Sequence, residues 1–296
     1  MSPRALQRVL VSGAAGMLGS QLLRSAPAGV EALGTDLASG DGLAAPGVDL
    51  AEREALAALW EALGPFDGVI HAAAWTAVDL AEEREDDARR ANVDASRALA
   101  EVARERGARL VAIGTDFVFD GEKRAPYTED DAPNPLGAYG RTKLEGERAL
   151  LAAHPEAAVV RTQWLYGPRG RHFPRAIVAL ARERGRLRVV DDQIGSPTTT
   201  LELAPAVWDV LASGAAGVFH AACEGAVSWH GFAAAVLAAC GLQDVVLEPC
   251  SSAEFPRPAR RPAYSVLDGS RLARLRGRPL APWRRALTDY LEVEPL

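Results

Sequence analysis

The chain has little of several features on which whole classes of protein depend. It contains three cysteines among 296 residues, too few and too scattered for a disulfide framework or a Cys-x-x-Cys metal site. Its five histidines show no metal-ligand spacing, so we expect no bound metal. No apolar run is long enough to span a bilayer, so no association with a membrane is expected.

Positive charge is also scarce. Lys and Arg number 33 against 39 Asp and Glu, which gives a formal net charge of −6. Binding along a phosphate backbone needs a basic face, so no nucleic-acid partner is expected. The stretch from Val9 to Leu18 is apolar enough to imitate a signal peptide, but glycines interrupt it. We therefore expect a globular enzyme of the cytoplasm.

The most informative stretch runs from Val9 to Gly19. An apolar, β-branched run stops at a glycine turn, which opens into a helical pattern, and this is the first unit of a mononucleotide-binding α/β fold. Glycines let a pyrophosphate approach the main chain, and the free amides at the helix N-terminus attract the anion. Gly13, Gly16 and Gly19 are spaced one residue off the standard Gly-x-Gly-x-x-Gly, and no P-loop lysine follows. The segment predicts a dinucleotide site.

Strand-like and helix-like stretches alternate over roughly the first 190 residues, which is typical of a parallel sheet covered by helices. We expect an α/β fold: a Rossmann-type doubly wound parallel sheet with a smaller C-terminal α/β substrate lobe. Residues 1–161 form the expected dinucleotide domain, to which some later segments return, and residues 162–296 mainly form the lobe. Expected later elements are helices over Phe173–Arg184, Leu201–Ala212 and Trp229–Cys240 and a strand over Gly217–Ala222.

An acidic residue follows the second expected strand. Val30 to Gly34 ends at Asp36, about twenty residues after the glycines. An acid there hydrogen-bonds the ribose hydroxyls and repels a 2′-phosphate, which favours NAD(H) over NADP(H). Asp36 is also suited to begin a turn, but the glycine loop favours the ligand role. Asp49 and Leu50 end the next apolar piece, where a side chain can face the adenine.

Small residues end the strand expected next. Ala72, Ala73 and Ala74 leave room for a ligand at the carboxyl end of a strand, where open α/β sheets bind their ligands. We expect Trp75, Thr76 and Val78 to line the pocket near the nicotinamide ribose. In the helical stretch that follows, Asn92 either binds a backbone carbonyl or water beneath the site or is exposed.

A hydroxyl, a phenol and an amine complete the pattern. Thr115 lies at the carboxyl end of an expected strand, and Tyr139 and Lys143 are four residues apart, so they share one face of a helix. An ammonium near the phenol is expected to lower the tyrosine pKa from about 10 towards neutrality. The pattern predicts Tyr139 as proton donor to a carbonyl oxygen that is being reduced, with Thr115 holding the same oxygen.

The sequence resembles the extended short-chain dehydrogenases/reductases, and among them the reductases of dTDP-linked 4-keto-6-deoxy sugars. The resemblance runs nearly end to end. It is carried by His71–Glu82, Gly114–Gly121, Tyr139–Glu147, Arg161–Gly167, Asp192–Thr198 and Arg261–Asp268. It implies that Tyr139 protonates the C4 oxygen of the keto sugar after hydride delivery from NADPH or NADH, because such enzymes often use both.

Site residues are also implied by the resemblance. The catalytic residues are Thr115, Tyr139 and Lys143. The cofactor lies on Gly13, Gly16, Met17, Leu18, Asp36, Asp49, Leu50, Ala72, Ala73, Ala74, Tyr139 and Lys143. The substrate, a dTDP-linked 4-keto-6-deoxy sugar, contacts Thr76, Val78, Thr115, Trp164, Gln193, Pro197 and Thr198. Packing within the lobe is the alternative role for Trp164, and Glu202 is assigned to a helix capping box with Thr199.

Three positions depart from the family pattern. Gly114 stands where Ser is usual, Trp75 where Tyr or His is common, and Gln163 where Ser is usual. Trp75 and Gln163 are expected to reshape the sugar pocket. The resemblance also leaves room for a homodimer.

Two other functions compete with the reductase. One is an epimerase, dehydratase or reductase of another nucleotide-linked keto sugar; Asp116-Phe117 after Thr115 argues against dehydration, for which an Asp-Glu pair is usual. The other is a non-catalytic NADP-binding regulatory subunit. The complete set of Thr115, Tyr139 and Lys143 favours an enzyme.

Overall fold

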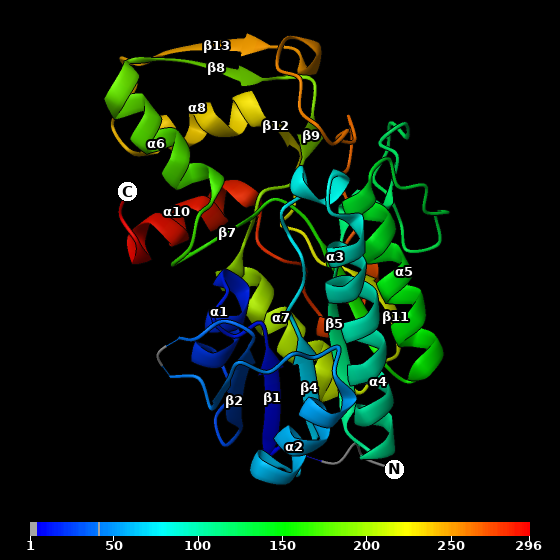
Figure 1. Cartoon of the computed structure of the whole chain (residues 1–296). Helices are drawn as coiled ribbons and strands as arrows, with labels where there is room; N and C mark the ends of the chain where they lie inside the picture. Colours follow the sequence, from blue (N-terminus) through cyan, green and yellow to red (C-terminus); the bar gives the residue numbers. More distant parts are fainter. Residues whose placement is uncertain (1–4, 41) are drawn as a thin grey trace.

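Within residues 5–40 and 42–296, which the computed structural model describes, seven parallel strands form the main sheet (Figure 1). Their order across the sheet is β11-β6-β5-β4-β1-β2-β3. The strands are β1 Arg8–Ser12, β2 Glu31–Asp36, β3 Ala45–Pro46, β4 Gly68–His71, β5 Arg109–Thr115, β6 Ala158–Thr162 and β11 Gly217–His220. The expected doubly wound α/β class is confirmed.

The sheet grows in opposite directions from its centre. β1 pairs with β2 on one side, where Val11 lies opposite Gly34, and with β4 on the other, where Val11 lies opposite Ile70. The connections that leave β1 and β4 therefore diverge at the carboxyl edge, which opens a crevice there. In folds of this kind, that crevice is the place for a ligand.

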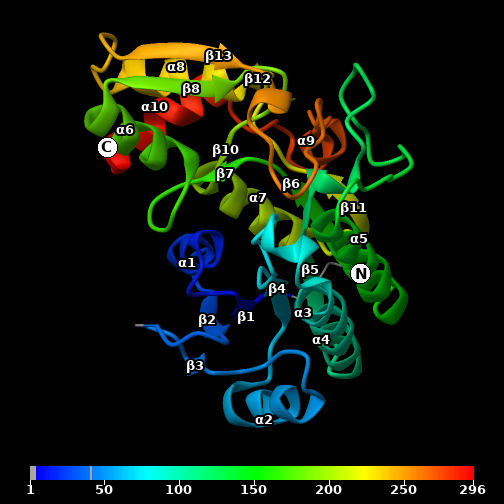
Figure 2. The same ribbon diagram turned by 45° about the horizontal axis from the view of Figure 1, so that its top comes forward.

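Side chains of the central strands alternate between two apolar layers. Val9 and Val11 of β1 pack on one face, and Leu10 packs on the other. This period of two fits a sheet buried on both faces, and it requires helices on each side. α1 (Met17–Arg24) and α7 (Thr200–Ser213) cover the first face (Figure 2). The second face is covered by α2 (Arg53–Leu63), α4 (Ala95–Glu105) and α5 (Ala138–Ala153).

The helical segments that cover or flank the sheet are named by their bounds. They are α1 Met17–Arg24, α2 Arg53–Leu63, η1 Leu80–Glu82, α3 Glu85–Arg89, the π-helical η2 Arg90–Asp94, α4 Ala95–Glu105, η3 Asp116–Val118, α5 Ala138–Ala153, α7 Thr200–Ser213 and α9 Ser270–Arg276. α7, β11 and α9 all come after residue 162 yet contact the sheet or its helices. The division of the chain at residue 162 stays a prediction.

A smaller lobe lies over the carboxyl edge of the sheet (Figure 1). β8 and β13 pair in parallel, and α6 and α8 pack against them through Ile177, Leu187 and Leu237. Its elements are β7 Leu165–Tyr166, α6 Phe173–Arg184, β8 Arg186–Val190, β9 Ile194–Gly195, β10 Thr198–Thr199, β12 Val227–Ser228, α8 Trp229–Ala239, β13 Val246–Cys250, η4 Ser252–Glu254 and α10 Trp283–Val293.

The prediction of a capping box at α7 is right for Thr199 and wrong for Glu202. Thr199 is the N-cap and its side chain accepts a hydrogen bond from the Leu201 amide. The Glu202 carboxylate instead accepts a hydrogen bond from the backbone amide of Ala281. This is possible because the C-terminal part of the chain passes beside the start of α7. Glu202 therefore joins two distant segments rather than closing its own helix. Among the described helices, none is long and apolar enough to cross a membrane.

Candidate active site

A cavity of about 700 Å³ lies at the carboxyl edge of the sheet, below the small lobe. It is bounded by the turn between β1 and α1, the ends of β2, β4 and β5, the first turns of α5, and the segments 162–165 and 170–171. The residues that the sequence predicts for the cofactor all line it: Gly13, Gly16, Met17, Leu18, Asp36, Asp49, Leu50, Ala72, Ala73, Ala74, Tyr139 and Lys143. Thr76, Val78, Thr115 and Trp164 line it as well.

The glycine turn is shaped by close backbone approaches. Gly13 has a φ of +69°, and a Cβ there would lie 2.5 Å from the Ala73 amide nitrogen. A Cβ on Gly19 would lie 2.0 Å from the Gly13 carbonyl oxygen. α1 begins at Met17, and its N-cap, Gly16, leaves the first amides free to meet an anion. The glycine turn and the first amides of α1 form a hollow, here called the cradle, which side chains in place of the glycines would fill. This cradle fits the pyrophosphate of a dinucleotide.

Acidic side chains stand at the far end of this cradle. Asp36 accepts hydrogen bonds from the Ala15 and Ala38 amides, both at 3.0 Å, so its carboxylate is fixed beside the glycine turn. The Ala51 amide and then the Arg90 guanidinium hold the pKa of Asp49 below its usual range. Both side chains line the cavity, where their oxygens suit hydrogen bonds to the hydroxyls of a ribose.

A buried histidine supports the floor of the cradle. His71, at the end of β4, lies 2.8 Å from the Ser12 hydroxyl through Nδ1 and 3.1 Å from the Ser96 hydroxyl through Nε2. Burial lowers the pKa of His71 to about 3, with a smaller effect from Lys143. The imidazole is therefore neutral at physiological pH and acts as a hydrogen-bonded strut between β1, β4 and α4.

Asn92 is buried, so the alternative of an exposed amide is wrong. It lies in the π-helical turn η2, where its Oδ1 accepts from the Trp75 amide at 2.9 Å and its Nδ2 donates to the Thr142 hydroxyl at 3.0 Å. The partner is a backbone amide rather than the expected carbonyl or water. Asn92 thereby ties the loop after β4 to the helix that carries Tyr139 and Lys143.

The hydroxyl, the phenol and the amine meet at the cavity wall. Thr115 ends β5, and Tyr139 and Lys143 lie one turn apart near the start of α5. The Thr115 side chain is hydrogen-bonded to that of Tyr139. Lys143 donates from Nζ to the Ile113 carbonyl at 2.7 Å. The end of β5 and the start of α5 therefore bring three polar groups to one place, where they can hold a carbonyl oxygen.

The expected downward shift of the tyrosine pKa is wrong for this state of the protein. Burial raises the pKa of Tyr139 to about 12, and the hydrogen bond with Thr115 opposes it only in part. Burial also lowers the pKa of Lys143 to about 8, opposed by Glu147. The Lys143 ammonium donates to Ile113, and desolvation outweighs any help it gives to a phenolate. Tyr139 is consequently a protonated phenol at neutral pH, as a proton donor must be.

Trp164 forms the wall on the lobe side. Its φ of +48° is in the left-handed region, which side chains other than glycine rarely adopt. Its ring stacks on that of Trp229, with centroids 3.6 Å apart and planes 9° apart. A Cβ on Gly195 would lie 2.6 Å from the Trp164 ring. The indole is thus held in place by the lobe on one side and lines the cavity.

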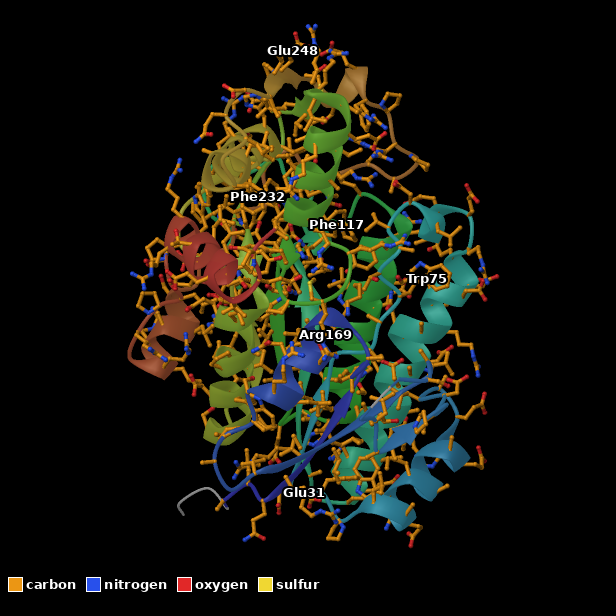
Figure 3. The ribbon with its side chains drawn as sticks, turned by 90° about the vertical axis from the view of Figure 1, so that its left-hand side faces the viewer. Glu31, Trp75, Phe117, Arg169, Phe232 and Glu248 are labelled. Atoms are coloured by element: carbon orange, nitrogen blue, oxygen red, sulfur yellow. The ribbon has the colours of Figure 1, made fainter. Side chains whose placement is uncertain are left out.

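Several predicted contacts lie off the cavity lining. Trp75 was expected in the lining, but its indole nitrogen donates to the Ala77 carbonyl and its ring faces Arg84, near α3 (Figure 3). Gln193 donates to the Ser252 hydroxyl at 2.8 Å. Pro197 is buried, and the Thr198 hydroxyl donates to the Ser196 carbonyl. The substrate roles of Gln193, Pro197 and Thr198 stay predictions.

The structure adds residues that the sequence analysis did not assign to the site. Asp116 is buried, and burial raises its pKa to about 7; its Oδ2 has no hydrogen-bond partner among the described residues. Its position directly after Thr115 was the available signal. The Phe117 ring packs edge-on to that of Tyr139, with centroids 5.4 Å apart. Arg171 had no local signal, because its loop reaches the cavity only through the tertiary fold.

One of the three departures, Gly114, has a structural explanation at this site. A Cβ on Gly114 would lie 2.5 Å from Oε1 of Glu147, whose buried ion pair with Arg161 spans 2.8 Å. The ion pair therefore occupies the space of a side chain at position 114. Gln163 is buried and lines the cavity.

Comparison with known proteins is consistent with this geometry. The family model described as the RmlD substrate binding domain matches residues 7–294. A dTDP-4-dehydrorhamnose reductase of Mycobacterium tuberculosis is 42% identical over 96% of this chain and 92% of the relative. A probable dTDP-4,6-dihydroxy-2-methyloxan-3-one 4-ketoreductase of Streptomyces antibioticus is 40% identical over 95% of this chain and 94% of the relative. The crystal structure of a Bacillus anthracis dTDP-4-dehydrorhamnose reductase in complex with NADP superposes with a TM-score of 0.90, at 31% identity, over 98% of this chain and all of that one.

Proposed function

Because the chain belongs to the RmlD substrate binding domain family, we propose that it is a dTDP-4-dehydrorhamnose reductase. Its reaction is the transfer of hydride from NADPH or NADH to the C4 ketone of dTDP-4-dehydro-6-deoxy-L-mannose, which gives dTDP-L-rhamnose. The predicted resemblance to reductases of dTDP-linked 4-keto-6-deoxy sugars is confirmed by the matches.

One observation carries the proposal. Thr115, Tyr139 and Lys143 line the same cavity as the glycine turn and the alanines after β4. A dinucleotide seated on the turn can reach the phenol without leaving the cavity. A regulatory subunit would need the turn but not the three polar groups.

The residues divide the work as follows. Gly13, Gly16 and the first amides of α1 would hold the pyrophosphate of the dinucleotide, and the Asp36 side chain would bind its adenosine ribose. Nicotinamide supplies the hydride when bound. Tyr139 donates its proton to the sugar oxygen, since its pKa keeps it protonated at neutral pH. The Thr115 hydroxyl holds the same oxygen, and Lys143 supplies positive charge beside the phenol as its proton leaves.

A single assay tests the proposal. The protein is incubated with the dTDP-linked 4-keto-6-deoxy sugar and NADPH or NADH, with and without a 3,5-epimerase, and oxidation of the nicotinamide is followed by absorbance. Oxidation that requires the epimerase is the expected result. Oxidation without it indicates a reductase of another keto sugar. Cofactor binding without any oxidation contradicts the proposal and indicates a regulatory subunit.

The second candidate remains within the same chemistry. The Streptomyces antibioticus relative is named as a ketoreductase of a different dTDP-linked ketone, at nearly the same identity as the Mycobacterium tuberculosis enzyme. The Gln163 side chain in the cavity gives this chain its own means of selecting the sugar. The epimerase arm of the assay separates the two candidates.

Location and assembly are part of the same proposal. We place the enzyme in the cytoplasm; Cys223, Cys240 and Cys250 are free thiols, which suits a reducing compartment. A homodimer is proposed from the family resemblance. Its mass in solution, measured by light scattering, tests the dimer directly.

A further inference from the structure

Gln163 is a buried amide whose nitrogen is left over. The residue is 2% exposed and directly follows Thr162 at the end of β6, next to Trp164 on the cavity wall. Its Nε2 has no hydrogen-bond partner among the described residues, although the atom is buried. A buried donor without a partner is costly, so such groups in native proteins have an explanation, and a ligand is one.

The orientation of this amide is fixed by its other end. Oε1 accepts from the Ser196 backbone amide at 3.0 Å, and the Ser265 hydroxyl lies 3.3 Å from it. A flipped amide would set its NH₂ group against the Ser196 N–H, two donors face to face. The nitrogen is therefore the atom of this amide that keeps an unused donor.

The neighbours of Gln163 show which part of that molecule it meets. Asp116 accepts from the Thr115 hydroxyl at 3.2 Å and lies near enough to Ser265 for that side chain to lower its pKa. Gln163 is thus linked, through Ser265 and Asp116, to the residue that holds the reacting oxygen. If the ketone is held at Thr115, as the proposed function requires, groups along this wall face the sugar ring rather than its nucleotide.

From this geometry we infer that Gln163 is a specificity-determining residue, whose Nε2 donates a hydrogen bond to a ring hydroxyl of the bound sugar. The inference rests on the proposed function, since it takes the ligand to be the dTDP-linked 6-deoxy sugar. Sugars that lack that hydroxyl leave the donor unpaired in a dry wall and are bound less well. A site that expects a hydrogen bond rejects the analogue without it.

The test is a thermodynamic cycle in which the side chain and the sugar are changed one at a time and together. Binding of dTDP-L-rhamnose, its 2-deoxy analogue and its 3-deoxy analogue is measured by calorimetry with NADP⁺ present, in the wild type and in Gln163→Met. Met is close to Gln in length and shape but has no donor and only a weak acceptor. In the wild type, one deoxy analogue is expected to bind about 10-fold more weakly than the parent sugar. In Gln163→Met this discrimination should disappear.

A purely structural role gives a different result. If Gln163 serves only to hold Ser196, the variant weakens the parent sugar and both analogues equally, and the ratio between them is unchanged. That outcome overturns the inference. Ser265→Ala is the control: it removes the hydroxyl 3.3 Å from Oε1 but leaves Nε2 in place. Only the ratio of the affinities for the parent sugar and the deoxy analogue is compared, and this ratio should remain that of the wild type.

The same measurements distinguish a failure of the proposed function from a failure of the role inferred for Gln163. If the wild type binds dTDP-L-rhamnose and turns over the keto sugar, the activity stands whatever Gln163→Met does. If the wild type does neither, the substrate assignment falls, and the role of Gln163 towards it falls with it.

Discussion

The two sides of the active-site cavity are built on different principles. The side proposed to hold the dinucleotide, called the dinucleotide side, is lined by Gly13, Gly16–Gly19, Asp36, Asp49–Leu50 and Ala72–Ala74. The side proposed to hold the sugar, called the sugar side, is lined by Asp116–Phe117 and Thr162–Leu165. The first is mainly backbone and small side chains. The second is mainly large or polar side chains brought together from separate strands and loops.

The polar atoms of the two sides differ in whether they already have hydrogen-bond partners. On the dinucleotide side, Asp36 and Asp49 already accept hydrogen bonds from backbone amides. On the sugar side, within the described part of the chain, buried atoms of Asp116, Thr162 and Gln163 have no partner. The proposed function assigns the backbone cradle to a shared cofactor and the unpaired side-chain atoms to discrimination between sugars. The following experiments test this contrast, from the largest expected effect to the smallest.

Tyr139→Phe, at the boundary between the two sides, should lower kcat about 1,000-fold, or about 4 kcal/mol. Only the proton donor is lost and the ring remains, so cofactor affinity should stay near that of the wild type. Steady-state kinetics and cofactor titration measure the two quantities. Tyr127→Phe is the control, because that hydroxyl bonds Asp120 outside the cavity lining. Substantial activity in Tyr139→Phe would remove the proposed mechanism.

Gly13→Ala should destabilise the protein by about 3 kcal/mol and weaken cofactor binding. A methyl group there combines a positive φ with a 2.5 Å approach to the Ala73 nitrogen. Denaturant unfolding measures the change. Gly29→Ala is the matched control, since Gly29 has a φ of +83° but no atom within 4 Å of the added Cβ, and about 1 kcal/mol is expected. Equal losses at both sites would show that the close approach contributes nothing.

Acid should weaken the support beneath the dinucleotide side. The pKa of His71 is about 3 in the folded protein against an ordinary value of 6.5, so the unfolded chain binds the additional proton between these values. The stability from the neutral imidazole is complete above pH 6.5 and is lost as the pH falls towards 3. At pH 5 the loss is about 2 kcal/mol for this residue.

Thermal unfolding between pH 5 and 8 measures this loss. His172 and His220, with pKa values lowered by burial to about 4 and about 3, add losses of the same sign. His71→Gln should make the dependence on pH shallower by the share of His71. An unchanged slope in that variant would assign the acid sensitivity to the other histidines.

Asp36→Asn should change cofactor preference modestly. Removal of the carboxylate relieves its repulsion of a 2′-phosphate, so the ratio of NADPH to NADH affinity should rise about 5-fold, or about 1 kcal/mol. Titration with each cofactor gives the ratio. Asp49→Asn serves as control, because that carboxylate is engaged by Arg90. A ratio that moves equally in both variants would mean that general charge, rather than the position of Asp36, sets the preference.

The sequence alone determined the features that depend on near neighbours. The glycine turn, the alternation of strands and helices, and the pairing of Tyr139 with Lys143 each lie within a few residues, so backbone geometry fixes them locally. α6 has the predicted bounds Phe173–Arg184 for the same reason, since its apolar residues recur at helical spacing.

Only the tertiary structure decided what is buried together. The pKa of Tyr139 rises because several segments exclude water from it, and no local spacing reveals this. Trp75 turns away from the cavity because Ala77 and Arg84 receive it. Gln163 acquires an unpaired nitrogen because Ser196, 33 residues further along, takes its oxygen. Burial and hydrogen-bond balance are sums over distant parts of the chain, and they exist only after it has folded.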